Sequence, residues 1–310
     1  TSRVTDMAGA FKYRIAFKGD ISGWDTRAVT NMEYLLFNAT SFTADLSQWS
    51  GVATQDRQTE MLYGAVSFAG KFLCENEISG PLNSCGPIEK LTNSNFQSAI
   101  NSCLSESAAG VTGDCVTYGT STTKFGVMST WDVSLVTNMQ DAFYNKGSFN
   151  GDISRWDTSS VTTMRQMFYG ANSFDRDLND WDTSSVRDMY RIFYSSNANP
   201  DIAMWDTSSM QTMHRVFDRA YMFNRNLTAW DTSSVTEMNY MFTYAHKFNG
   251  EVNGWDTSNV RNMYYMFHYA YDFDQDLDKW DTSSVTDMHY MFEYAHDFNG
   301  KVGTWDVSQV

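Results

Sequence analysis

The chain has 310 residues, a formal net charge of −15 and an aromatic content of 15%. Disordered chains are poor in aromatic residues, so this composition excludes a largely disordered protein. The sequence contains no run of 18 or more apolar residues, which excludes a membrane-spanning helix within it. Nucleic acids and anionic membrane surfaces attract basic proteins, so the negative charge argues against both as partners.

All ten tryptophans lie in one register, which is the first evidence for the architecture. They are Trp24, Trp49, Trp131, Trp156, Trp181, Trp205, Trp230, Trp255, Trp280 and Trp305. Seven of the nine gaps between them are 25 residues, one is 24 and one is 82. A fixed period of this size is typical of a solenoid, in which each repeat forms one coil.

A complete repeat reads W-D-T-S-S-V-T-x-M-x-x-M-F-x-x-A-x-x-F-N-x-x-L, and we count offsets from Trp as zero. Apolar residues at offsets 8, 11, 12 and 15 have the spacing of one helix face, as in Met288, Met291, Phe292 and Ala295. The stretch that leads into each Trp alternates and predicts a short strand. The pattern therefore predicts coils of a short strand plus a short helix that share one continuous core.

The first predicted segment, 1–72, is an N-terminal repeat array that carries Trp24 and Trp49. Arg14 stands where other coils have Ala, so we expect this coil to open locally. An N-A-T sequon makes Asn38 a candidate for glycosylation.

The second predicted segment, 73–125, is an insert that holds all four cysteines, Cys74, Cys85, Cys103 and Cys115. An even number confined to the segment without the repeat core predicts disulfides and an oxidising compartment. We favour local pairing, Cys74–Cys85 and Cys103–Cys115, among the three possible connectivities. A zinc site is the alternative, but the C-x-x-C spacing typical of such sites is absent.

The insert also contains one predicted helix. Phe96, Ala99, Ile100, Cys103 and Leu104 form an apolar stripe, with Asn93 or Ser94 as the N-cap. We expect this helix to cover the open edge of a coil or the flank of the solenoid, in preference to a role as a partner site.

The third predicted segment, 126–310, is the C-terminal repeat array. Its last coils align six tyrosines at offsets 10 and 14, namely Tyr240, Tyr244, Tyr265, Tyr269, Tyr290 and Tyr294. They either stack within the solenoid or form an aromatic contact surface, because exposed Tyr is enriched at interfaces. An N-L-T sequon at Asn226 lies at an expected strand edge, which makes it the better glycosylation candidate of the two.

Two polar rows run along the whole repeat. Asp follows Trp in nine of the ten repeats, and we expect each Asp to accept hydrogen bonds from the following T-S-S turn. A row of calcium sites is the alternative, and apart from this possible calcium we expect no cofactor. Thr at offset 2 forms a second row, for which an ice-binding surface is a minor hypothesis. The five histidines are spread over four offsets, and we expect them on the surface.

The repeats W-D-T-S-S-V-T-D-M-H-Y-M-F-E-Y-A-H-D-F-N (280–299) and W-D-T-S-S-V-T-T-M-R-Q-M-F-Y-G-A (156–171) resemble the BspA-like surface-protein repeats, a family of unknown function noted in mycoplasma surface lipoproteins. The match covers about 250 of the 310 residues. The resemblance implies an α/β repeat protein, a right-handed solenoid of about ten coils akin to leucine-rich repeats. It also implies an extracellular or cell-surface role, and it carries over no catalytic residues.

No nucleophile motif, phosphate-binding loop or zinc-helix motif occurs in the sequence, so we expect a non-catalytic protein. The favoured hypothesis is a structural or adhesive component of a surface layer, fibre or appendage. It would self-associate, or contact other surface proteins, matrix proteins or glycans. The alternative is a binding module that recognises glycans or proteins through the six aligned tyrosines. The sequence begins and ends within a coil, so we expect a longer array or ends that stack on neighbouring molecules.

Overall fold

The computed structural model describes residues 4–46, 49, 55–58, 60–69, 72–73, 86–87, 90–106 and 128–310. The chain divides into two compact units. Thr1–Lys90 and Cys115–Thr130 make up the first, and Leu91–Asp114 and Trp131–Val310 make up the second. The predicted helix of the insert thus belongs to the second unit.

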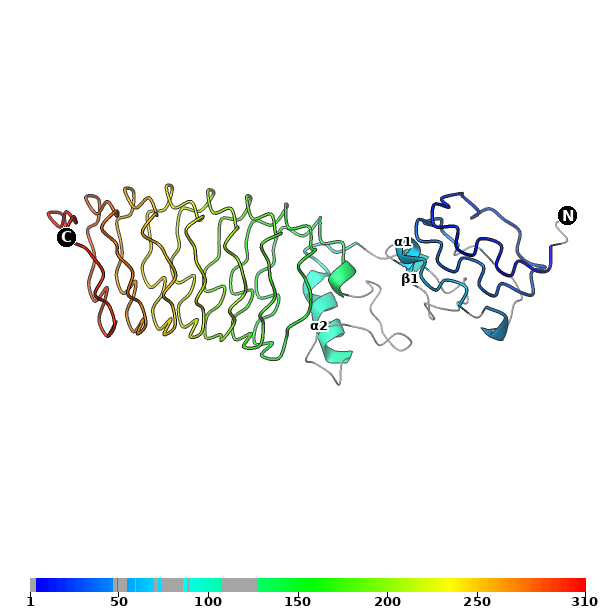
Figure 1. Ribbon diagram of the computed structural model, residues 1–310, viewed down its shortest axis with the longest axis horizontal. Helices are drawn as coiled ribbons and strands as arrows, with labels where there is room; N and C mark the ends of the chain where they lie inside the picture. The colour runs from blue at the N-terminus through cyan, green and yellow to red at the C-terminus, as the bar shows by residue number, and fades with distance from the viewer. Residues whose placement is uncertain are drawn as a thin grey trace. The chain divides into compact units, whose positions relative to one another are not determined.

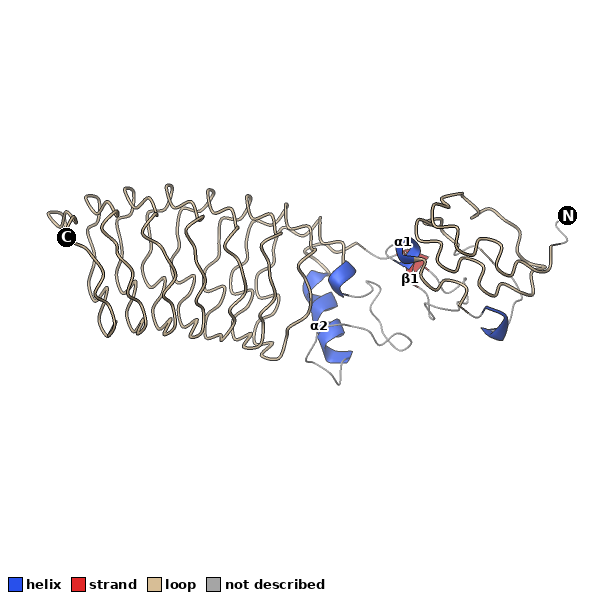
Figure 2. Cartoon of the chain, viewed as in Figure 1, coloured by secondary structure: helices blue, strands red, loops and turns tan. Residues whose placement is uncertain are grey.

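Regular secondary structure is sparse in the described residues (Figure 2). The helices are η1 (Gln55–Gln58), α1 (Val66–Ala69), α2 (Phe96–Glu106) and η3 (Met128–Thr130). The two strands, β1 (Phe72–Leu73) and β2 (Gly86–Pro87), pair antiparallel. Among the described residues, no helix is long and apolar enough to cross a membrane.

Stacked coils make up most of the second unit, where they follow one another as a row of similar loops (Figure 1). Isolated parallel bridges join neighbouring coils at residues 25 apart. One series links Asn138, Thr163 and Asp188, and another links Thr212, Glu237, Asn262 and Asp287. The Trp register of the sequence is therefore the stacking register of the coils.

The M-x-x-M-F-x-x-A stretch is not the predicted short helix. In the coil after Trp230, the backbone N–H groups at offsets 8, 10, 12 and 14 donate to carbonyls of the next coil at 2.8–2.9 Å. Between them, Met241 and Thr243 donate three positions back within their own coil, and Tyr240 and Tyr244 have φ of 58°. An α-helix requires negative φ and bonds four residues back. An α-helix and this series of turns bury apolar residues at the same spacing, which is why the sequence pattern suggested a helix.

The core repeats from coil to coil. Val285, Met263, Phe267 and Ala270 show the usual pattern, since each side chain is fully buried at its offset. Trp255 and Trp280 stack with ring centroids 6.3 Å apart and planes within 8°. The buried indoles of Trp181, Trp205, Trp230, Trp255 and Trp280 also keep a hydrogen bond, as Trp255 Nε1 donates to the carbonyl of Leu227 at 2.9 Å. Buried Trp needs such a partner, so the Trp row fixes both packing and register.

The Asp row forms the expected turns. In seven successive coils of the second unit, Oδ1 of the Asp after Trp accepts from the backbone N–H and the hydroxyl of the Ser two residues on. These bonds lower the pKa of Asp182, Asp231 and Asp281, with the Ser hydroxyl as the main cause. At Asp25 the Arg27 side chain replaces the hydroxyl and lowers the pKa to about 2.

The Thr row at offset 2 is buried, which makes the ice-binding hypothesis wrong. Thr257 is 1% exposed, and its hydroxyl donates to the backbone carbonyl of Asp281 in the next coil at 2.9 Å. Five other coils of the second unit repeat this bond at 2.8–2.9 Å. An ice-binding surface needs its Thr side chains exposed, whereas these hydroxyls join coils inside the array.

Helix α2 covers the first coil of the second unit, as the sequence suggested. Its apolar stripe is buried at Phe96, Ala99, Ile100 and Cys103. Gln97 Nε2 donates to the carbonyl of Ala142 at 3.2 Å. In later coils the carbonyl at this offset accepts from a backbone N–H of the preceding coil, so Gln97 takes the place of that donor. Asn93, expected as an N-cap, instead accepts from two backbone N–H groups of that coil, at Thr137 and Asn138.

Candidate functional site: a face of tyrosines and arginines

The six predicted tyrosines come together in two stacked columns. In the column at offset 10, the rings of Tyr265 and Tyr290 lie 5.0 Å apart, and Tyr240 stacks on Tyr265 at 5.3 Å. In the column at offset 14, Tyr269 lies between Tyr244 at 4.6 Å and Tyr294 at 4.4 Å. The columns arise from the left-handed backbone of the coil, since all six tyrosines have φ between 56° and 61°.

The left-handed conformation of these residues is unfavourable and must be offset. It costs an L-residue about 1–2 kcal/mol. The backbone N–H of Tyr265 donates to the carbonyl of His289 at 3.0 Å, and that of Tyr269 donates to the carbonyl of Glu293 at 2.9 Å. Ring stacking between coils adds to these bonds. Tyr290 and Tyr294 are 53% and 48% exposed, while the other four tyrosines are half-buried.

Three arginines occupy the same two offsets in the preceding coils, and the sequence reasoning missed them. The guanidinium of Arg215 lies 3.8 Å from the ring centre of Tyr240, and that of Arg219 lies 4.6 Å from that of Tyr244. Arg191 lies 4.5 Å from the ring centre of Tyr194. These are cation–π distances, so Arg215 and Arg219 continue the two columns, and Arg191 packs on Tyr194 of its own coil. We call the six tyrosines with Arg191, Arg215 and Arg219 the aromatic face.

A buried carboxylate anchors the arginine part of the aromatic face. Asp218 is 1% exposed and pairs with Arg215 at 2.6 Å. Burial raises the pKa of Asp218, and the neighbouring Arg215 guanidinium opposes that rise. Arginines at offsets 10 and 14, where later coils have Tyr, were the signal in the sequence that would have located this cluster.

One histidine lies inside the aromatic face and not on the surface as expected. His268 is 9% exposed and contacts the rings of Tyr265 and Tyr269 at 4.3 and 4.4 Å. Burial lowers its pKa to about 4. Its Nε2 lies 3.1 Å from Oε2 of Glu293, outside hydrogen-bonding geometry. His289, by contrast, is exposed as predicted.

The remaining predicted sites are only partly within the described residues. Cys103 is disulfide-bonded and 1% exposed, whereas Cys74, Cys85 and Cys115 lie outside the described residues. Asn226 is exposed and accepts from the backbone N–H of Thr228. Asn38 is half-buried, with its amide oxygen against Gly64. The predicted connectivity and glycosylation stay predictions.

The described part of the chain holds no group of three or more His, Cys, Asp or Glu side chains that could bind a metal ion. The Asp row is engaged in Ser hydrogen bonds along the second unit. No observation in these residues therefore favours the calcium hypothesis over the turn interpretation.

Comparison with known families finds one match. A family model described as "Mycoplasma protein of unknown function, DUF285" matches residues 1–76, 116–230 and 211–310. Searches of curated proteins and of solved structures find no match to the chain. The match spans both repeat arrays and supports a tandem-repeat protein.

Proposed function

The chain belongs to this DUF285 family of unknown function, and we propose that it is a non-catalytic structural or adhesive repeat protein of the cell surface. The repeats would be of the BspA-like surface-protein type, in a right-handed, leucine-rich-repeat-like solenoid. It would assemble through the aromatic face into a layer, fibre or appendage.

The observation that carries this proposal is the repetition of one face. Tyr240, Tyr265 and Tyr290 offer the same side chain once per coil, and each neighbouring pair is already stacked. A surface ordered in this way loses little side-chain entropy when it binds. A repeated surface also matches a repeated partner, such as the same face of a second copy.

The backbone ladder supports end-to-end contacts in addition. Within the offset 8–14 stretch, every inter-coil bond runs from an N–H of one coil to a carbonyl of the next, as from Phe242 to Met266 and from Phe267 to Met291. Within this stretch each coil therefore offers donors toward the next coil and acceptors toward the preceding one. Two arrays meeting head to tail would continue this ladder.

A surface location is supported by Cys103. This residue is disulfide-bonded, and stable disulfides form in oxidising compartments. An extracellular protein would meet this requirement.

The test is sedimentation velocity over a wide concentration range, with electron microscopy of the largest species. We expect concentration-dependent mass for the wild-type chain and a weaker association for Tyr265→Asn/Tyr290→Asn, because Asn tolerates the left-handed backbone. Tyr221→Asn, which lies outside the aromatic face, is the control. A wild-type chain that stays monomeric at every concentration contradicts assembly.

A second candidate function is glycan or protein binding through the same face. It is favoured by the stacked tyrosines of this face, because Tyr is enriched at interfaces and its ring can pack on a sugar or protein surface. This second function would be favoured if the protein stays monomeric and binds a component of a glycan or surface-protein array. The Tyr265→Asn/Tyr290→Asn variant should then lose that binding.

A further inference from the structure

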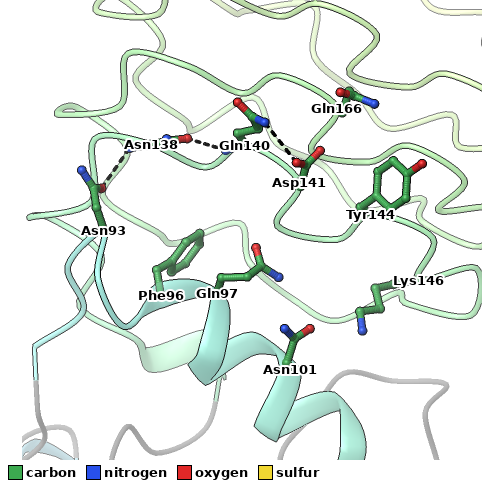
Figure 3. Close-up of a pocket in the computed structure, with 10 residues that line it drawn as sticks. All are labelled: Asn93, Phe96, Gln97, Asn101, Asn138, Gln140, Asp141, Tyr144, Lys146 and Gln166. Atoms are coloured by element: carbon green, nitrogen blue, oxygen red, sulfur yellow. Dashed lines mark hydrogen bonds between the residues drawn. The ribbon is translucent and has the colours of Figure 1, made fainter.

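A polar cavity lies between α2 and the first coils of the second unit (Figure 3). Its volume is about 640 Å³, within the range of roughly 300–1,000 Å³ that is usual for small-molecule sites. Gln97 and Asn101 border it from the helix side. Asp141, Tyr144, Lys146 and Gln166 border it from the coils.

The cavity follows from how α2 meets the first coil. Asn93 and Gln97 hold the helix against the backbone at Thr137, Asn138 and Ala142. Beyond these contacts, Lys146 occupies the offset where later coils have a small buried Ala. The backbone of this coil keeps the usual turn, since Lys146 N–H donates to the carbonyl of Phe143 and Phe149 N–H donates to that of Lys146. The Lys146 side chain borders the cavity, so the space is lined by residues of the cap and of this coil.

The polar groups around the cavity have hydrogen-bonding capacity left over. Within the described residues, the side chains of Asn101, Lys146 and Gln166 make no hydrogen bond. Asp141 accepts one hydrogen bond, from Gln140 Nε2 to Oδ2 at 3.1 Å, and its Oδ1 has no partner there. The lining thus combines amides, which both donate and accept, with one carboxylate and one ammonium whose formal charges cancel.

One aromatic ring adds a flat apolar surface. Tyr144 begins a column in which it stacks on Tyr169 at 4.5 Å, and Tyr169 stacks on Tyr194 at 4.9 Å. Tyr169 covers one side of the Tyr144 ring, and the ring borders the cavity and is 38% exposed as a residue. A flat ligand with an apolar face can extend this column on the cavity side.

We propose that this cavity binds a neutral saccharide. A pyranose ring has hydroxyl groups around its edge, which donate and accept as the amides, Asp141 and Lys146 require. It also has an apolar C–H face that can lie on Tyr144. An apolar ligand would leave these polar groups unpaired at a cost, and a strongly charged ligand would face either Asp141 or Lys146 with the wrong sign.

The test uses the full chain and a panel of neutral di- and trisaccharides, including cellotriose, maltotriose and N,N′-diacetylchitobiose. Saturation-transfer NMR detects weak binding, and calorimetry gives the Kd. Free glycine, lysine and glutamate form a second arm, because a zwitterion could pair with Asp141 and Lys146. We expect at least one saccharide to bind and the amino acids not to bind.

The variants Asp141→Asn and Lys146→Gln locate the site. Asn keeps the left-handed backbone of residue 141, where φ is 58°. Each variant should weaken saccharide binding by about tenfold, since a hydrogen bond to a charged group is lost. Asp297→Asn and Lys279→Gln change the same residue types at exposed positions and should bind like the wild type.

Three outcomes would overturn the proposal. The first is a panel in which no saccharide binds at millimolar concentration. The second is saccharide binding that both cavity variants leave unchanged while their circular dichroism and melting temperature match the wild type. The third is binding of amino acids in place of saccharides. If one variant fails to fold, the other and the panel still decide the question.

Discussion

A single hydroxyl group at offset 2 joins each coil to the next. The Thr257 hydroxyl is buried and donates to the carbonyl of Asp281 at 2.9 Å. Thr257→Val keeps the shape but leaves that carbonyl without this donor, so we expect the free energy of unfolding to fall by about 1–3 kcal/mol. Urea unfolding measures the change. Thr228→Val, at an exposed position, should stay within about 0.5 kcal/mol of the wild type.

His268 predicts a pH dependence of stability. Its pKa is about 4 in the folded chain, because burial disfavours the charged ring, and about 6.5 in the unfolded chain. Between these values the unfolded state binds more protons, so stability falls as the pH drops from about 6.5 to about 4. Above that window His268 contributes no pH dependence.

The measurement is the urea midpoint at several pH values between 7.5 and 4 for the wild type and His268→Gln. The urea midpoint of His268→Gln should fall less than that of the wild type as the pH drops. His289→Gln changes an exposed histidine and should keep it. A wild type and a His268→Gln variant with parallel pH profiles would contradict the assigned role of burial.

The repeat pattern could be predicted at the level of coils but not within the M-x-x-M-F-x-x-A stretch. Buried residues such as Met263, Met266, Phe267 and Ala270 have helical spacing in a chain of turns as well. The deciding feature is the left-handed backbone at Tyr265 and Tyr269, and large aromatic residues give no sequence signal for it. The Asp turns were predictable because Asp, Ser and their hydrogen bonds lie within three residues.

Close approach of two coils makes one glycine indispensable. A Cβ at Gly250 would collide with the backbone carbonyl oxygen of Arg225 and lie 2.9 Å from the ring of Phe248. We expect Gly250→Ala to lower the free energy of unfolding by about 1–3 kcal/mol, the usual cost of overpacking. Gly254→Ala is the matched control, since its Cβ would meet no atom within 4 Å. Equal urea midpoints for the two variants would contradict this account.

Helix α2 should depend on its disulfide. Cys103 is disulfide-bonded and buried on the face that packs beneath the first coil. Reduction, or Cys103→Ser, should lower stability by about 2–4 kcal/mol. Thermal melts with and without reductant measure this effect. Ser102→Ala is the control. If the reductant still lowers the melting temperature of Cys103→Ser, the loss of stability comes from a different disulfide.

At the scale of the chain, the Trp register anticipated the order of the coils, because each Trp stacks on a Trp one period away, as Trp255 does on Trp280. The cavity beneath α2 was not predictable. It depends on Asn101 meeting Asp141 and Lys146 across 40 or more residues, and no local pattern reports that distance. The arginines of the aromatic face were visible in the alignment of repeats, but their stacking on Tyr depends on the same left-handed backbone.

The net charge of −15 should control the proposed assembly. Copies of such a chain repel each other, and this repulsion is screened over about 8 Å at physiological salt but reaches about 30 Å at 0.01 M. Stacked tyrosines associate through apolar contact, which salt does not weaken. We therefore expect association through the aromatic face to strengthen between 10 and 150 mM NaCl, measured as weight-average mass by sedimentation equilibrium. Tyr265→Asn/Tyr290→Asn should show little mass increase at either salt concentration. Association that weakens as salt is added would contradict contact through the tyrosines. Such a result would indicate that ion pairs hold the copies together, and Arg191, Arg215 and Arg219 would be the first residues to substitute.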